Sequence, residues 1–260
     1  MSAAYLSLLG VLIPLLALAG LGLLASKFKA WGSRQEAALL AIALLCLVTG
    51  LTAGLFATPP ETKMREVMRI LYVHVPTAWN ALVFATVALI AAIGSLSNKR
   101  RSWDATNTAA IEVGLVFVVM LLIQGSIWGK ATWDSFWEWD PRLTTTAIMG
   151  VSFAGVLSLR SFADGGDRKR VWTAVASIIA YIDVPIVYFV VDLAPGIHQE
   201  RSSPGTVSDE FHWPLRAVAF GLLFLGSWLV LKRGRLELLT TEAEAEAPAA
   251  DGPALVAGGE

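Results

Sequence analysis

Long apolar segments and short polar segments alternate along the whole chain. Seven apolar segments of about twenty residues each cover 4–25, 36–57, 77–97, 109–129, 143–161, 171–193 and 213–232. A helix of about twenty apolar residues crosses the roughly 30 Å hydrocarbon core of a bilayer. The pattern therefore predicts an all-α fold, a polytopic membrane helix bundle with about seven transmembrane helices.

The first segment could be read as a signal peptide, but its flanks do not fit one. No basic stretch precedes it, and no small-residue cleavage site follows it. We expect it to be a retained helix, so residues 1–35 form an extra N-terminal transmembrane helix and a basic loop. Residues 36–235 then form the membrane domain, and the Ala/Glu-rich residues 236–260 form a disordered tail.

Composition supports a membrane protein and excludes one kind of chemistry. Hydrophobic residues make up 55% of the chain and charged residues 16%, against about a quarter charged in soluble domains. The single cysteine, Cys46, lies inside an apolar segment. Thiol–disulfide exchange within the chain and a cysteine-based zinc cluster are therefore excluded.

The basic residues predict the orientation, because positively charged loops stay in the cytoplasm. Every second connection is basic. The four clusters are Lys27, Lys29 and Arg34; Lys99, Arg100 and Arg101; Arg160, Arg168, Lys169 and Arg170; and Lys232, Arg233 and Arg235. Loops 58–76, 130–142 and 194–212 then lie outside, with the N-terminus outside and the C-terminus cytoplasmic.

The first of these outer loops contains a helical pattern. Apolar residues recur at helical spacing within 61–73, and charged residues fill much of the opposite face. This predicts a short helix on the outer interface. Because Pro76 disfavours helix in the residue before it, we expect this helix to end near Val75, with His74 at the junction to the next spanning helix.

The second outer loop is unusually rich in tryptophan. Trp128, Trp133, Trp137 and Trp139 are four of the ten tryptophans and fall within twelve residues. Interfacial tryptophan is common in membrane proteins, but one lipid-facing stripe cannot hold all four. At 100° per residue Trp133 and Trp137 share one face of a helix, and Trp128 lies near Trp139 on another. Two such walls suit a flat, apolar ligand with a polar edge.

The three histidines suggest what that ligand is. His74, His198 and His212 all fall in the predicted outer loops. Two histidines from separate loops beside an aromatic surface suggest axial ligation of haem iron, which needs only one or two protein ligands. From the chemistry of the residues alone, His198 is only slightly favoured over His212 as a haem ligand.

These residues carry a family resemblance. Trp128-Gly129, Trp133, Trp137-x-Trp139-Asp140-x-Arg142 and Leu143-Thr144 resemble the tryptophan-rich signature of haem-handling proteins in cytochrome c biogenesis. The Arg-Leu-Thr ending and the flanking histidines are similar to the haem exporter protein C (cytochrome c maturation protein C) branch. Residues 69–76 and 197–199 resemble its other two outer loops, and the resemblance covers about 45–232.

The resemblance implies a concrete function without bond-making catalysis. His74 and His198 would be the axial, metal-binding ligands of haem b. The cofactor-binding residues would also include Trp128, Gly129, Trp133, Trp137, Trp139, Asp140 and Arg142. The haem would pass at the periplasmic side of a bacterial inner membrane to a periplasmic haem chaperone. The expected partners are an ABC-type transporter with its ATPase subunit, a small single-pass membrane subunit and the lipid bilayer, with no nucleic acid.

The sequence also departs from the family. The family usually has Gly where this chain has Asp134, which places a carboxylate at the bend of the loop. The family core has six spanning helices, so segment 4–25 is additional. Arg142 is equally suited to a haem propionate and to an ion pair with Asp140 or Glu138.

Four polar residues within the predicted spans are Glu112, Gln124, Asp183 and Asp192. Glu112 and Asp192 lie near span ends, where solvation at the interface accounts for them. Asp183 precedes a Val-Pro pair, and a carboxylate beside such a break could pair within the bundle or line a polar cavity.

Three other functions stay open. A cytochrome c synthetase-type subunit would present haem directly to apocytochrome, but it typically has further histidines within its spans. A haem permease would conduct haem itself, and without a Walker A motif any ATP-driven step needs another subunit. A purely structural membrane subunit would tolerate loss of both His74 and His198.

Overall fold

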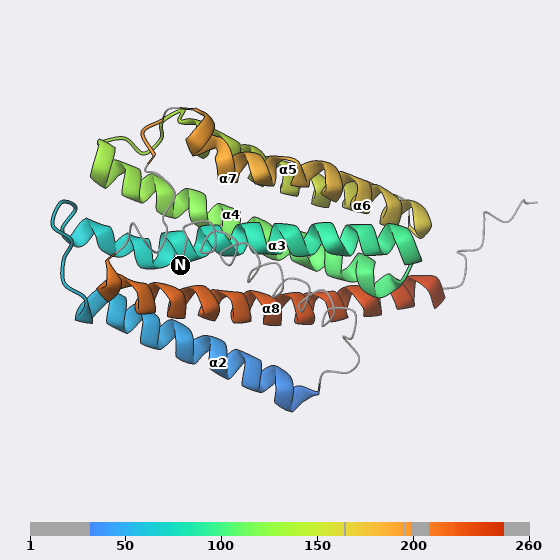
Figure 1. The fold of residues 1–260 in the computed structure, drawn as a ribbon. Coiled ribbons are helices and arrows are strands. Elements are labelled where there is room, and N and C mark those ends of the chain that lie inside the picture. Colours follow the sequence, from blue (N-terminus) through green and yellow to red (C-terminus); the bar gives the residue numbers. More distant parts are fainter. Residues whose placement is uncertain (1–31, 164, 195, 199–207, 247–260) are drawn as a thin grey trace, which may run out of the picture.

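The structure is a computed structural model that describes residues 32–163, 165–194, 196–198 and 208–246. Within them the chain is a bundle of long helices that run along one common direction (Figure 1). The helices are α2 (Ser33–Thr52), α3 (Leu71–Asn98), α4 (Arg101–Trp133), α5 (Pro141–Phe162), α6 (Asp167–Tyr181), α7 (Asp183–Leu193) and α8 (Asp209–Glu246). A π-helical turn, Ala53–Ala57, extends α2, and a 3₁₀ turn, Glu66–Ile70, precedes α3.

Six helical stretches are long and apolar enough to cross a membrane, which confirms six of the predicted spans. They are Ser33–Ala57, Glu66–Asn98, Arg101–Trp133, Pro141–Phe162, Asp167–Leu193 and Asp209–Ala243. The expected seventh helix, at 4–25, lies outside the described residues.

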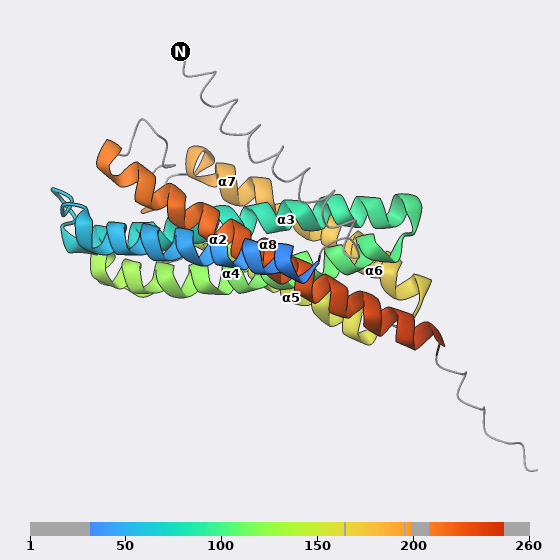
Figure 2. The same cartoon turned by 90° about the horizontal axis from the view of Figure 1, so that it is seen from below.

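The bundle is layered around α3 and α4. Helix α8 packs between α2 on one side and the α3–α4 pair on the other, while α5, α6 and α7 cover the far side of that pair (Figures 1 and 2). The α3–α4 contact is lined by small buried residues, among them Ala81, Ala88, Ala109 and Ala110. Small side chains let two helix backbones approach closely, which is how membrane helices gain van der Waals contact.

The core continues outward from this small-residue contact with larger side chains. Phe84 and Phe117 stack with ring centroids 5.6 Å apart, and Phe153 and Met149 of α5 are fully buried beside them. This core fixes α3, α4 and α5 relative to one another. The starts of α3, α5 and α8 lie at the same end of the bundle as the ends of α4 and α7 (Figure 1). We call that end the site end.

The prediction of an interfacial helix ending near Val75 is wrong. The 3₁₀ turn runs directly into α3, and α3 continues through Pro76 to Asn98. Leu71, Tyr72 and Val75 are buried with Phe211 and Leu215 of α8. This burial outweighs the local preference of the residue before proline for extended backbone. His74 therefore lies within the first turns of a spanning helix, and His212 likewise lies in the first turn of α8, so only His198 is in a loop.

The C-terminal helix is longer than the sequence suggested. A tail without fixed structure was expected from residue 236, but α8 continues to Glu246. Glu237 and Leu238 are both buried, and this tertiary contact holds the helix beyond its apolar part. Residues 247–260 lie outside the described residues.

An ion-pair cluster occupies the end of the bundle opposite the site end, and it consists of Asp104, Arg160, Glu237, Arg233 and Glu112. Arg160 holds both oxygens of Asp104, at 3.0 and 2.9 Å, and its Nη2 also lies 2.7 Å from Glu237 Oε1. Glu237 Oε2 lies 3.0 Å from Arg233 Nη1, and Arg233 Nε lies 2.6 Å from Glu112 Oε2. Glu112 thus has an ion-pair partner, in addition to its place near a span end.

Several of the basic residues used to predict the orientation take part in such pairs. Arg160 and Arg170 are buried, while Lys232 and Arg235 both pair with Glu36 of α2. These cations join helices at the opposite end, besides adding to the charge of its connections. The orientation itself stays a prediction.

Candidate haem site

Two of the three histidines meet around one tryptophan at the site end. The ring centroid of His74 lies 5.4 Å from that of Trp128, and the ring of His198 lies 6.3 Å from Trp128 on an edge-to-face geometry of 89°. Trp133 adds a third aromatic neighbour, 6.4 Å from both Trp128 and His198. Residues from α3, α4 and the segment 196–198 therefore lie in one cluster, and the predicted binding of haem by this cluster stays a prediction.

Helix α4 supplies the buried part of this cluster. Trp128 is only 5% exposed, and His74 packs at Gly125, where an added Cβ would lie 3.4 Å from His74 Cε1. Gly125 precedes Trp128 by about one helical turn, so both lie on the same face of α4. His74 packs against this face, where Gly125 has no side chain and the Trp128 indole lies beside it. The site is therefore anchored on two spanning helices, with one loop added.

The end of α4 sets the shape of the tryptophan loop. The helix ends at Trp133, and Asp134 takes a left-handed conformation with φ of 57°. Lys130 Nζ holds this turn by donating to Asp134 Oδ1 and to its carbonyl oxygen, at 2.6 and 3.1 Å. Left-handed backbone favours glycine, so the unusual Asp134 does lie at the bend, and a lysine one turn earlier stabilises it.

This early helix end makes the predicted pairing of tryptophans wrong. Trp128 pairs with Trp133, and Trp137 pairs with Trp139 at 5.8 Å and 85°. Helical spacing beyond Trp133 has no meaning, because residues 134–140 are loop. The structure contains one ring pair on the helix and a second in the loop, and their role as two walls of a ligand surface stays a prediction.

The two tryptophan pairs differ in the exposure of one member each. Trp139 is 81% exposed, as its loop neighbour Phe136 is at 61%, whereas Trp128 is buried, and Trp133 and Trp137 are both half-buried. The loop folds back over Gly129, where an added Cβ would lie 3.0 Å from the Ser135 carbonyl oxygen. Gly129 therefore makes room for the loop.

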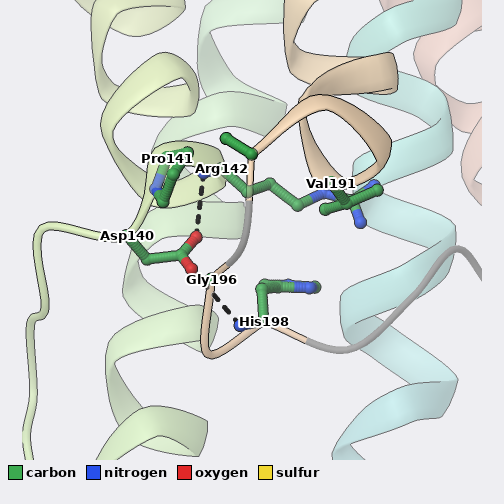
Figure 3. Close-up of a pocket in the computed structure, with 7 residues that line it drawn as sticks. Asp140, Pro141, Arg142, Val191, Gly196 and His198 are labelled. Atoms are coloured by element: carbon green, nitrogen blue, oxygen red, sulfur yellow. Dashed lines mark hydrogen bonds between the residues drawn. The ribbon is translucent and has the colours of Figure 1, made fainter.

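Asp140 connects the tryptophan loop to the histidine loop (Figure 3). It is the N-cap of α5, and its Oδ1 accepts hydrogen bonds from the backbone N–H groups of Arg142 and Leu143, at 2.8 and 3.4 Å. Its Oδ2 accepts from the backbone N–H groups of Ile197 and His198, at 2.9 and 3.3 Å. One buried carboxylate thus holds the start of a spanning helix and the loop that contains His198.

A pocket of about 190 Å³ lies beside this carboxylate. Its lining residues are Asp140, Pro141, Arg142, Val191, Ala194, Gly196 and His198. The side chains of Arg142 and His198 extend in the same direction from opposite sides of Asp140 (Figure 3). A cation and an imidazole therefore line the same pocket, which suits an acidic group on the edge of a planar ligand.

Several polar atoms of the site are buried without a hydrogen-bond partner among the described residues. They are His74 Nδ1, Gln124 Oε1, Trp128 Nε1 and Trp137 Nε1. Buried polar atoms are normally paired, and two of these atoms belong to rings in contact with each other, His74 and Trp128, which suits a ligand-binding region. The described residues contain no group of three or more His, Cys, Asp or Glu that could hold a bare metal ion, and haem iron needs only one or two protein ligands.

Three polar residues outside this cluster can also be placed. His212 Nδ1 on α8 lies 3.7 Å from Asp209 Oδ1, and its Nε2 is buried without a hydrogen-bond partner in the described part of the chain, as His74 Nδ1 is. What separates His212 from His74 and His198 is that no described ring contact joins it to the tryptophans. Asp192 is exposed. Asp183 lies at the break between α6 and α7, and its Oδ2 has no hydrogen-bond partner in the described part of the chain.

Sequence reasoning did not find the bridging role of Asp140, nor Gly125 and Gly196. The Asp-Pro pair at 140–141 is a helix-start signal, and it could have identified Asp140 as an N-cap. Its second contact joins residues 57 positions apart, and no local signal reports it.

Comparison with known proteins identifies the family. The model of the family described as Heme exporter protein C (CcmC) matches residues 22–249. The chain belongs to the Heme exporter protein C family. The match is wider than the 45–232 that the motifs suggested, and it leaves most of segment 4–25 outside.

Individual members of the Heme exporter protein C family align over most of the chain. The protein of that name from Bradyrhizobium diazoefficiens is 30% identical over 217 residues, 81% of this chain and 82% of its own length. The Haemophilus influenzae protein is 32% identical over 209 residues, and the Escherichia coli K12 protein is 31% identical over 208; each alignment covers 78% of this chain and 84% of the relative.

Proposed function

We propose that this chain is a subunit of a haem export system for cytochrome c maturation, and that it holds haem b at the site end between His74 and His198. Membership of the Heme exporter protein C family supports the export function. The axial ligation is the finer part of the proposal and depends on the geometry of the cluster.

One observation carries the ligation proposal. Both imidazoles contact the same indole, Trp128, although their residues are 124 positions apart, and His74 Nδ1 has no hydrogen-bond partner among the described residues. A neutral imidazole with an unused ring nitrogen is a good iron ligand. The indoles of Trp128 and Trp133 would contact the porphyrin, and Arg142 would pair with a propionate.

The remaining parts follow from this placement. We propose that the site end faces the periplasm of a bacterial inner membrane, in agreement with the basic connections at the opposite end. The exposed loop with Trp139 and Phe136 would then meet the periplasmic haem chaperone, while an ABC-type transporter and a small single-pass subunit complete the system. In this function the chain binds and transfers haem without making or breaking covalent bonds.

The experiment is haem binding by the purified full-length protein, followed by absorbance in the Soret region. We expect the wild type to retain haem, and His74→Ala and His198→Ala each to weaken binding at least about tenfold, with a shifted Soret band. Each variant removes one imidazole and leaves the aromatic contacts in place.

His212→Ala is the matched control, because it removes the third histidine from the same end of the bundle. It should bind haem as the wild type does. A wild-type protein without Soret absorbance after reconstitution, or a His212→Ala variant that loses haem while the other two keep it, contradicts the proposal.

A further inference from the structure

Asp140 does more in this structure than its place in the tryptophan motif suggests. Its side chain is 6% exposed, and its two oxygens together accept four backbone hydrogen bonds. Two donors belong to the first turn of α5 and two to the loop at Ile197 and His198. Hydrogen bonds to a carboxylate are roughly twice as strong as neutral ones, so this is a strong link between the two segments.

Gly196 supports the same link independently. A Cβ built on Gly196 would overlap Asp140 Oδ2 and would lie 3.4 Å from Pro141 Cδ. Any larger residue would push the loop away from the carboxylate. The backbone at Gly196 and the side chain of Asp140 therefore fit each other closely.

The position of His198 depends on this link. Two contacts of His198 bear on its position: its backbone N–H donates to Asp140, and its ring lies against Trp128 and Trp133. The backbone hydrogen bond fixes the position of the His198 main chain, and the ring contacts fix the position of its imidazole. Loss of the first would leave the imidazole attached to a loop that has lost its anchor on α5.

We infer that Asp140 is a positioning residue, which holds the His198 imidazole in its place against Trp128 by binding the backbone of residues 197 and 198. Its oxygens are occupied by N–H groups, so it contributes to haem binding through His198 and not by contact with haem. The effect on haem depends on the proposed function, whereas the anchoring of the loop does not.

The key variant is Asp140→Ser. Serine is a good N-cap and keeps α5 capped, but it has a single short oxygen and cannot also reach Ile197 and His198. Gly196→Ala is the second variant and disturbs the same contact from the other side. Asp134→Asn is the matched control. Asp134 belongs to the same loop but pairs with Lys130, and asparagine, like aspartate, tolerates the left-handed backbone at this position.

The first measurement is hydrogen–deuterium exchange at the amides of Ile197 and His198 in the haem-free protein. We expect exchange to be about tenfold faster in Asp140→Ser and Gly196→Ala, because each loses hydrogen bonds to a charged group. It should be unchanged in Asp134→Asn, and the amides of Arg142 and Leu143 should stay protected in Asp140→Ser. Unchanged exchange at Ile197 and His198 in Asp140→Ser overturns the inference.

The second measurement is haem affinity of the same variants, alone and combined with His198→Ala. Asp140→Ser should weaken haem binding about tenfold in the wild-type background and add almost nothing when His198 is already absent, because both changes remove one interaction. An equal further loss in the His198→Ala background would mean that Asp140 acts on haem directly, which overturns the inference. A wild type that binds no haem defeats the proposed function, and the exchange measurement still decides the role of Asp140.

Discussion

The two ends of the bundle differ in whether their buried polar groups have partners. In the ion-pair cluster, Arg160 is 6% exposed and has Asp104 and Glu237 as partners, while Arg233 joins Glu237 to Glu112. At the site end, His74 is similarly buried, yet its Nδ1 has no partner among the described residues, and the same holds for Trp128 Nε1. One end satisfies its buried charges internally, and the other leaves polar atoms unused.

This difference separates stability from function. Ion pairs join helices α4, α5 and α8 at the opposite end and stabilise the fold there. The site end can therefore contain buried polar atoms that do not stabilise the folded state. A buried polar atom without a partner costs free energy, and it persists where a ligand can use it. We therefore expect substitutions at the opposite end to lower stability, and substitutions at the site end to lower haem affinity.

The largest effect on stability is expected from Arg160→Ala. It leaves the carboxylates of Asp104 and Glu237 buried without their shared cation, and breaking a buried pair costs about 3–5 kcal/mol of unfolding free energy. Thermal unfolding in detergent measures the loss. Arg101→Ala, which removes an exposed arginine from the same end, is the control and should be nearly neutral. If the folded Arg160→Ala protein bound haem more weakly, the separation between the two ends would be wrong.

A smaller effect on stability, with a larger effect on haem, is expected from Trp128→Phe. The smaller ring leaves a cavity that costs about 1–2 kcal/mol, and it removes part of the surface that both imidazoles contact. Haem affinity should fall about tenfold. Trp103→Phe is the matched control at the opposite end, where Trp103 packs on Gly94, and it should lose stability without losing haem. Equal haem affinities of the two variants would show that Trp128 contributes no more to haem binding than Trp103 does.

The smallest effect is expected at Asp134, where the sequence departs from its family. Its left-handed backbone costs an L-residue about 1–2 kcal/mol, which glycine avoids. Asp134→Gly loses the exposed Lys130 ion pair but relieves the backbone, so the two changes nearly cancel. Asp134→Ala loses the pair without that relief and should be about 1 kcal/mol less stable than Asp134→Gly, as measured by chemical unfolding. The reverse order would show that the turn at Asp134 does not determine the loop.

The spans, and the gathering of several candidate residues at one end, could be predicted because their signals are local. Apolar segment lengths predicted seven helices, and six of them are present in the described part of the chain. The outer-loop positions of His198 and the tryptophans predicted that these residues would gather at one end. The motif at Trp128–Thr144 also predicted a family that the comparisons confirm.

The errors arise where distant contacts override local preference. Pro76 marks a helix boundary by its own geometry, but burial of the preceding turn against α8 carries α3 through it. The Ala/Glu-rich segment after residue 236 has the composition of a tail, but Glu237 pairs with Arg160, which lies 77 residues earlier. The link from Asp140 to His198 spans 58 residues. None of these contacts can be read from neighbouring residues.

Whether His74 and His198 both bind the iron is decided by the axial-ligand signature of ferric haem in the reconstituted protein, read by electron paramagnetic resonance and near-infrared magnetic circular dichroism. We expect two imidazole ligands in the wild type and in His212→Ala, and one in His74→Ala and in His198→Ala. A wild-type signature with any other ligand pair, or a two-imidazole signature that survives the loss of His74 or His198, would contradict this axial ligation.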